Sequence, residues 1–215
     1  MFRSSFIEDL SMEILKIYDE IDRKVSEFKS YTKLACPKDC GECCSKGNAK
    51  MPPIEFIPLA LELVKRGEFQ KYAELLSREE KKLCVLYTPL SSDKKKGYCT
   101  FYGLRAATCR LYGYGFKKDK YGQWVPVMCE YLKKCFINLP KMKIEEISFP
   151  DYDSIMIRLV SLYPSLAKER YAPTEALLMA LEKVSFLSFV PSTYNKYKYD
   201  PHNKKYTQSE KNMIE

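Results

Sequence analysis

Apolar residues near the start of the chain recur at alternating steps of three and four positions. This spacing matches one face of an α-helix, so it predicts a long amphipathic helix whose stripe packs against a core. Ser5 followed by Glu8 predicts a capping box at the start of that helix. The stripe consists of Ile7, Leu10, Ile14, Ile17, Ile21, Val25 and Phe28.

Helical patterns return later in the chain, and prolines separate the last of them. Proline is tolerated in the first turn of a helix and kinks it further along, so Pro58 must occupy one of these two places. Gly67 ends the first of these later helices in the way a C-terminal glycine commonly does. The predicted helical segments are 53–66, 69–82, 128–139, 151–163 and 174–190.

The middle of the chain follows a different pattern. Residues 35–50 contain Pro37, Gly41 and Gly47 without apolar periodicity, which predicts a loop. Residues 84–88 are predicted as a short strand, and residues 112–127 as a hairpin rich in aromatic side chains. We therefore expect a mainly α fold with a loop-rich, cysteine-bearing central region and at most a few short strands.

A chain of 215 residues with 46% hydrophobic positions usually forms one globular domain with its own core. We expect a single domain over 1–215, ending in a polar tail. Its expected parts are an N-terminal helix (1–34), a cysteine-cluster metal-binding core (35–140), C-terminal helices (141–190) and the tail (191–215).

Nine cysteines are unusual for a chain that needs no disulfides to stabilise its core. The acidic pair Glu8-Asp9 interrupts the apolar N-terminus before a signal peptide could form, and no stretch is apolar enough to span a membrane. We therefore expect a cytoplasmic protein without membrane attachment. Clustered cysteines in a reducing compartment bind metal more often than they form structural disulfides.

The formal charge of +8 counts every thiol as neutral, although a thiol that binds metal is a thiolate. Two zinc ions held by eight cysteines would lower this charge to about +4. The basic excess can therefore balance the metal centre, and it does not by itself indicate a nucleic-acid partner.

Four cysteines lie close together in the predicted loop, spaced Cys36-x3-Cys40-x2-Cys43-Cys44. A CxxC step lets two thiolates of one tight turn reach the same metal ion. Only one such step is present, so the other ligands must come from distant cysteines. Side chains of neighbouring residues are expected to diverge, so the adjacent pair would serve two sites or two corners of a cluster. The distant candidates are Cys84, Cys99, Cys109, Cys129 and Cys135.

Cys129 and Cys135 lie six residues apart, which places them on different sides of a helix. Only one of them is expected to face a given site, and we interpret Cys135 as the spare thiol. The one histidine, His202, lies in the polar tail and is expected to be solvated. A ligand set made of sulfur favours zinc or an iron–sulfur cluster.

Two stretches carry a resemblance to a known family. Cys36-Pro-Lys-Asp-Cys40-Gly-Glu-Cys43-Cys44 resembles the opening motif of the CxxCxxCC, or YkgJ-like, cysteine-cluster family, with one extra residue in the first interval. Cys99-Thr-Phe-Tyr-Gly-Leu-Arg105-Ala-Ala-Thr-Cys109-Arg110-Leu-Tyr112 resembles its second motif, CxIYxxRPxxCRxYP. Cys84 stands where the family has a cysteine before a short apolar stretch. Ala106 and Gly113 replace two prolines of the second motif.

The resemblance covers about residues 30–130 and implies a zinc- or iron-chelating domain, often labelled an iron–sulfur protein. We expect an iron–sulfur cluster, with Zn²⁺ as the alternative, and a role in redox chemistry or metal handling. Arg105 and Arg110 would donate to the sulfurs or balance their charge, unless they are ordinary ion-paired arginines. The expected metal ligands are Cys36, Cys40, Cys43, Cys44, Cys84, Cys99, Cys109 and Cys129.

Two other functions stay open. One is a nucleic-acid-binding module with a structural zinc centre, for which Tyr194–Tyr199 alternates rings with cations. We expect no nucleic-acid partner, because such a segment and the run Lys94–Lys96 are more simply solvated surface. The other is an enzyme similar to a flagellin lysine N-methylase, which carries a related cysteine cluster, although no residue here can be named as catalytic. The sequence names no protein partner.

Overall fold

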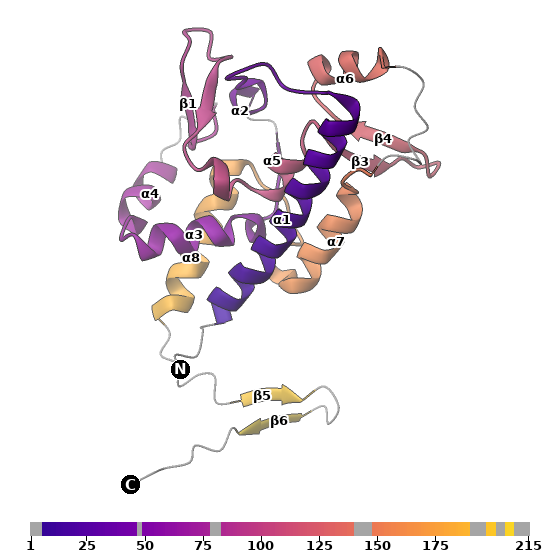
Figure 1. Ribbon diagram of the computed structural model, residues 1–215. Coiled ribbons are helices and arrows are strands. Elements are labelled where there is room, and N and C mark those ends of the chain that lie inside the picture. Colours follow the sequence, from indigo (N-terminus) through magenta and orange to yellow (C-terminus); the bar gives the residue numbers. More distant parts are fainter. Residues whose placement is uncertain are drawn as a thin grey trace.

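The computed structural model describes residues 6–46, 49–77, 83–139, 148–189, 197–200 and 205–208. Within them the fold is mainly α, as predicted (Figure 1). Short 3₁₀ turns cover Pro53–Phe56, Tyr102–Leu104 and Pro164–Leu166. The helices are α1 (Phe6–Thr32), α2 (Glu42–Lys46), α3 (Ile57–Lys65), α4 (Phe69–Leu76), α5 (Ala107–Leu111), α6 (Glu130–Ile137), α7 (Tyr152–Leu162) and α8 (Pro173–Phe189).

The strands form three antiparallel two-stranded hairpins in the described parts of the chain. The predicted hairpin over 112–127 is confirmed by the second of them. The predicted tail contains the third, while its other residues, His202 among them, lie outside the described ranges. The pairs are β1 (Tyr87–Pro89) with β2 (Gly97–Cys99), β3 (Gly115–Lys118) with β4 (Trp124–Val127), and β5 (Tyr197–Asp200) with β6 (Lys205–Gln208).

The core lies where α1, α3 and α8 pack together. Every residue of the predicted stripe on α1 is buried, which confirms that the stripe faces the core. Residues 53–61 are buried at each position, because this segment packs between α1 and α8. Pro58 occupies the first turn of α3, one of the two places expected for it.

Three predictions of local structure need correction. The strand expected over 84–88 is wrong, because β1 begins at Tyr87 and the residues before it form a turn. The loop expected over 35–50 contains the short helix α2. The helix expected over 69–82 is confirmed only as far as Leu76. Residues 78–82, like Ser5 of the expected capping box, lie outside the described ranges.

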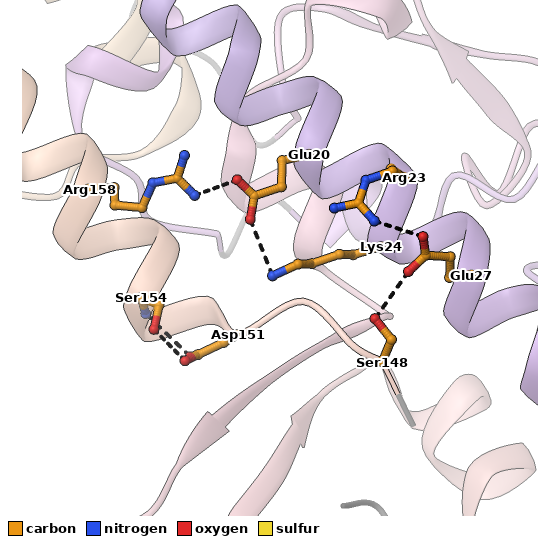
Figure 2. A network of polar contacts seen from close by, with 8 residues as sticks. All are labelled: Glu20, Arg23, Lys24, Glu27, Ser148, Asp151, Ser154 and Arg158. Atoms are coloured by element: carbon orange, nitrogen blue, oxygen red, sulfur yellow. Dashed lines mark hydrogen bonds and ion pairs between the residues drawn. The ribbon is translucent and has the colours of Figure 1, made fainter. Parts of the chain in front are cut away.

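Polar contacts join the exposed face of α1 to α7 (Figure 2). Arg158 on α7 donates to Glu20 at 2.5 Å, and Lys24 pairs with the same carboxylate at 3.2 Å. Further along α1, Glu27 accepts from Ser148 at 3.1 Å. Asp151 caps α7 by accepting from two backbone N–H groups of its first turn. These contacts hold the part of α1 between Glu20 and Glu27 beside α7 and the segment that precedes it.

An aromatic cluster fixes the positions of β3 and α6 against α1. The ring of Phe116 lies 5.5 Å from that of Phe28 on α1 and 5.6 Å from that of Phe136 on α6. Phe149 lies on the other side, 4.6 Å from Phe116 and 5.0 Å from Trp124. The last turn of α6, which carries Phe136, is therefore held through Phe116 and Phe28 against β3 and α1.

No helix in the described ranges is both long and apolar enough to cross a membrane.

Candidate metal centre

The eight predicted ligands come from four segments: the loop after α1 with α2, the β1–β2 hairpin, α5, and the start of α6. Figure 1 shows α6 beside the C-terminal end of α1, α2 and the β1 hairpin across the same end of the molecule, and α5 beside α1. All nine cysteines are free thiols. The fold therefore brings cysteines that are far apart in sequence to one end of the molecule.

The cysteine loop is fastened to the β1–β2 hairpin by its backbone. Cys40 forms an antiparallel bridge with Lys96. On one side of this bridge Gly41 N–H donates to the Lys95 carbonyl at 2.8 Å, and on the other Gly97 N–H donates to the Asp39 carbonyl at 2.9 Å. These two hydrogen bonds fix the register of Cys40 against Lys96, and so the position of the cysteine loop along the hairpin that carries Cys99 and follows Cys84.

Tyr87 fills the space between the loop and the hairpin. A Cβ atom added to Gly41 would lie 1.9 Å from the Tyr87 Oη atom, and one added to Gly97 would lie 2.5 Å from it. The Tyr87 hydroxyl donates to the Lys94 carbonyl at 2.8 Å, which holds the ring in this place. Glycine is therefore required at both positions for the two backbones to approach.

The sulfurs have neighbours that fall into two sets. Cys36 is close enough to Cys40, Cys43 and Cys129 to feel their charge. Cys109 has the same relation to Cys84, Cys99 and Cys43, and Cys44 has it to Cys84 and Cys109. The predicted ligands are therefore neighbours in space, and Cys43 lies where the two sets meet.

Four of these sulfurs accept hydrogen bonds from groups outside the cysteine cluster. The Tyr114 hydroxyl donates to Cys36 Sγ at 3.6 Å, and the Leu132 N–H donates to Cys129 Sγ at 3.5 Å at the start of α6. Cys84 and Cys99 each accept from the backbone N–H two residues further on, at Leu86 and Phe101. Donors of this kind stabilise thiolates and orient metal ligands. The sequence carried no signal for Tyr114, which lies 78 residues from Cys36.

The two adjacent thiols do not diverge as expected, because Cys43 and Cys44 hydrogen-bond to each other. This bond lowers the pKa of Cys43 to about 6 and raises the pKa of Cys44. Burial raises the pKa of Cys84 to about 11, and also raises the pKa of Cys99. Cys109 keeps an exposed edge, but its thiol lies deep among protein atoms and this burial raises its pKa.

The two arginines beside Cys109 have different surroundings. The Arg110 guanidinium donates to Asp22 and to the carbonyls of Gly103 and Arg105, so it joins α1 to α5 as a structural group. Arg105 stacks on the Tyr102 ring at 3.9 Å, and its charge lowers the pKa of Cys43 and acts on Cys99. Its Nε atom is buried and, among the described residues, has no hydrogen-bond partner. Of the two arginines, Arg105 is therefore the one whose charge acts on the sulfurs, although it also lies 3.9 Å from Asp22.

Glu55 positions α5 from the core side. Its carboxylate is fully buried and accepts from the Thr108 backbone N–H at 2.6 Å and from the Thr108 hydroxyl at 2.8 Å. Glu55 therefore caps the N-terminus of α5, the short helix that contains Cys109 directly after Thr108. Sequence reasoning missed Glu55, because a carboxylate inside an apolar segment gives no sign of the helix it caps.

The two departures from the second family motif also have a structural meaning. Ala106 has φ −56° and ψ 153°, values that proline can adopt. Gly113 has φ +100°, which proline cannot adopt. The backbone around Cys109 therefore keeps the proline-like conformation before the helix and replaces it with a glycine turn afterwards.

A cavity of about 250 Å³ lies beside the first set of sulfurs. Cys40 and Cys129 both line it, together with Tyr131 and the exposed residues Lys38, Lys95 and Lys96. Cys135 lies next to Tyr131 on α6, half-buried against the core. Solvent can therefore reach the first set from this side.

In the described residues, no three Cys, His, Asp or Glu side chains converge closely enough to hold a metal ion as they stand. Binding therefore needs thiol side chains to turn toward a common centre. The donor set suits such a centre, because it offers neighbouring thiols, N–H groups aimed at sulfur and the unpartnered Nε of Arg105.

Comparison with known proteins was made for the whole chain. Residues 35–130 match the CxxCxxCC family model. Its description is "putative zinc- or iron-chelating domain", so the match supports metal binding by this part of the chain. No curated protein and no solved structure gives a significant match. The CxxCxxCC segment includes all eight predicted ligands and leaves Cys135 outside.

Proposed function

We propose that the CxxCxxCC segment holds a metal centre through thiolates of Cys36, Cys40, Cys43, Cys44, Cys84, Cys99, Cys109 and Cys129. One observation carries the proposal: thiols from four separate segments are neighbours at one end of the fold. Packing alone would not explain this arrangement, because three of these cysteines are exposed.

The protein groups around the sulfurs have separate tasks in such a centre. The N–H groups of Leu86 and Phe101 act on the pKa values of Cys84 and Cys99 against the effect of burial, and the Leu132 N–H donates to Cys129 Sγ. All three would orient sulfurs toward a bound metal. Arg105 offsets part of the negative charge that several thiolates accumulate. The metal or cluster supplies the cross-link between segments and, in the iron–sulfur form, electron transfer.

An iron–sulfur cluster is the form we expect first, because the segment has one CxxC step whereas zinc ribbons use two. Zinc is the alternative. The iron–sulfur form suits redox chemistry, and either form suits metal handling.

Elemental analysis of the full chain purified without oxygen tests the proposal. We expect iron with an equal amount of acid-labile sulfide, and visible absorption that bleaches on reduction. Zinc without sulfide would retain the centre and change its metal. Protein that binds neither metal, under conditions in which it is folded, would contradict the proposal.

A further inference from the structure

We propose that the eight thiols form two adjacent four-sulfur centres, the outer one of Cys36, Cys40, Cys43 and Cys129 and the inner one of Cys44, Cys84, Cys99 and Cys109. This inference rests on the proposed metal binding. It adds how the ligands are divided and which centre exchanges its metal with solvent.

The first argument is the separation of neighbours. Cys36 has Cys40, Cys43 and Cys129 around it, whereas Cys109 has Cys84, Cys99 and Cys43, so Cys43 is the one thiol common to both. Cys40 and Cys129 line one cavity. Cys84 and Cys99 meet at the open end of the β1–β2 hairpin, where Cys99 is paired with Tyr87 in the strand register. Six of the eight thiols thus divide by place alone, three to each side.

The second argument assigns the adjacent pair. Cys44 has neighbours in the inner set, Cys84 and Cys109. Cys43 has neighbours in both sets, but it forms a CxxC step with Cys40, which suits two ligands of one metal. Each set then has four sulfurs, the number that closes a zinc site or one iron–sulfur cluster. The contact between Cys43 and Cys44 makes the two centres neighbours.

The third argument concerns access. Cys36 and Cys43 of the outer centre are exposed, and its other two residues line the cavity rimmed by Lys38, Lys95 and Lys96. In the inner centre the Cys109 thiol lies deep among protein atoms, and Cys84 and Cys99 pack against the hydrophobic core, as only Cys129 does in the outer centre. A chelator in solution should therefore reach the outer metal first.

Metal release followed by thiol labelling tests the division on the unaltered full chain. A chromogenic chelator such as pyridylazoresorcinol is added, and iodoacetamide is added after the first phase of release. We expect two phases of equal size. Peptide mass spectrometry should find the outer thiols alkylated after the first phase and Cys84, Cys99 and Cys109 still protected.

Variants give an independent measurement. Cys129→Ser keeps an oxygen that can accept the Leu132 N–H, and we expect this variant and Cys99→Ser each to retain about half of the wild-type metal. Cys135→Ser is the matched control and should retain all of it. The double variant Cys129→Ser/Cys99→Ser should retain none.

The outcomes separate the two proposals. A single release phase that exposes all eight thiols together would contradict the division and leave the metal centre standing. If Cys129→Ser and Cys99→Ser each lose all their metal while the wild type binds it, the division into two centres is likewise contradicted and metal binding is kept. Wild-type protein without any metal would contradict the proposed function itself.

Discussion

Gly41 shows how one missing side chain determines the site. The Tyr87 ring occupies the place where its Cβ would be, and the same ring lies against Gly97 in the hairpin. Both glycines therefore serve the approach of the cysteine loop to the hairpin. Glycine is required at both positions because a side chain would collide with Tyr87, and not because of backbone conformation, since neither glycine has a positive φ.

Gly41→Ala should push the loop away from the hairpin, because the added methyl cannot share space with Tyr87. We expect a loss of about 1–3 kcal/mol in the free energy of unfolding, the usual range for overpacking, and less metal per chain. Gly103→Ala is the control, because a Cβ there meets no atom within 4 Å. Thermal melts and metal analysis check both. Full metal content and stability in Gly41→Ala would contradict the role given to Tyr87.

At the scale of elements, the sequence predicted what local periodicity determines. The stripe of α1 repeats over many turns, so its buried face could be read directly. The β1–β2 hairpin has strands of three residues, too short for any alternation, and its position follows from backbone bonds to the loop at Asp39 and Gly41. The predicted ligands could be named from cysteine spacing. Arg105 could be named as well, because it stands in the second motif beside Cys109. Tyr114 could not, since it meets Cys36 only in the folded chain.

The short helix α5 depends on a buried carboxylate at its start. Burial raises the pKa of Glu55 from its ordinary 4.5 to about 7, against the opposing effect of the hydrogen bonds from Thr108. Between these two pH values the unfolded chain ionises this group while the folded chain keeps it protonated. The folded state then binds more protons, so its stability falls as pH rises through this window and levels off above about 7.

Glu55→Gln should remove this pH dependence. We expect the wild type to lose about 3 kcal/mol of unfolding free energy across the window, and the variant to lose correspondingly less. Denaturant unfolding at several pH values measures the difference. Glu62→Gln, which changes a surface carboxylate paired with Arg66 at 2.7 Å, should keep the wild-type slope. An unchanged slope in Glu55→Gln would show that another group titrates there.

Across the whole molecule, the basic residues do not gather in one element. Lys94–Lys96 lie in the turn of the β1 hairpin, while Lys117, Lys118 and Lys120 lie on β3 and the turn after it. Figure 1 shows these two hairpins on different sides of the molecule. The segment Tyr194–Tyr199 is only partly within the described residues. The continuous basic stripe that nucleic-acid binding uses is therefore not formed by these two hairpins.

We expect weak, non-specific binding to RNA or DNA at physiological salt, with Kd no tighter than about 10⁻⁶ M. Fluorescence anisotropy over a series of salt concentrations measures this affinity. Charge reversal at Lys95 and Lys96 should change it no more than the same reversal at Lys117 and Lys118. Sub-micromolar binding that depends on one of these pairs would favour the nucleic-acid module instead.

Residues 35–130 do more than bind metal. Residues 53–63, which form a 3₁₀ turn and the first part of α3, supply much of the central core. The cysteine loop and the β1–β2 hairpin contribute less to this core, because most of their side chains are exposed or half-buried. Loss of metal should consequently affect these parts first and leave the packing of α1, α3 and α8.

The scattering of the ligands along the chain has a consequence for synthesis. Cys129 follows Cys44 by more than eighty residues, so the outer centre lacks its fourth sulfur until that stretch has left the ribosome. At about 5–20 residues per second, the other three thiols of this centre wait roughly 4–17 s in a nascent chain that cannot yet enclose them. During this time they are open to oxidants and to whichever metal binds thiolate most tightly. The correct metal is therefore best delivered after the start of α6 has been made.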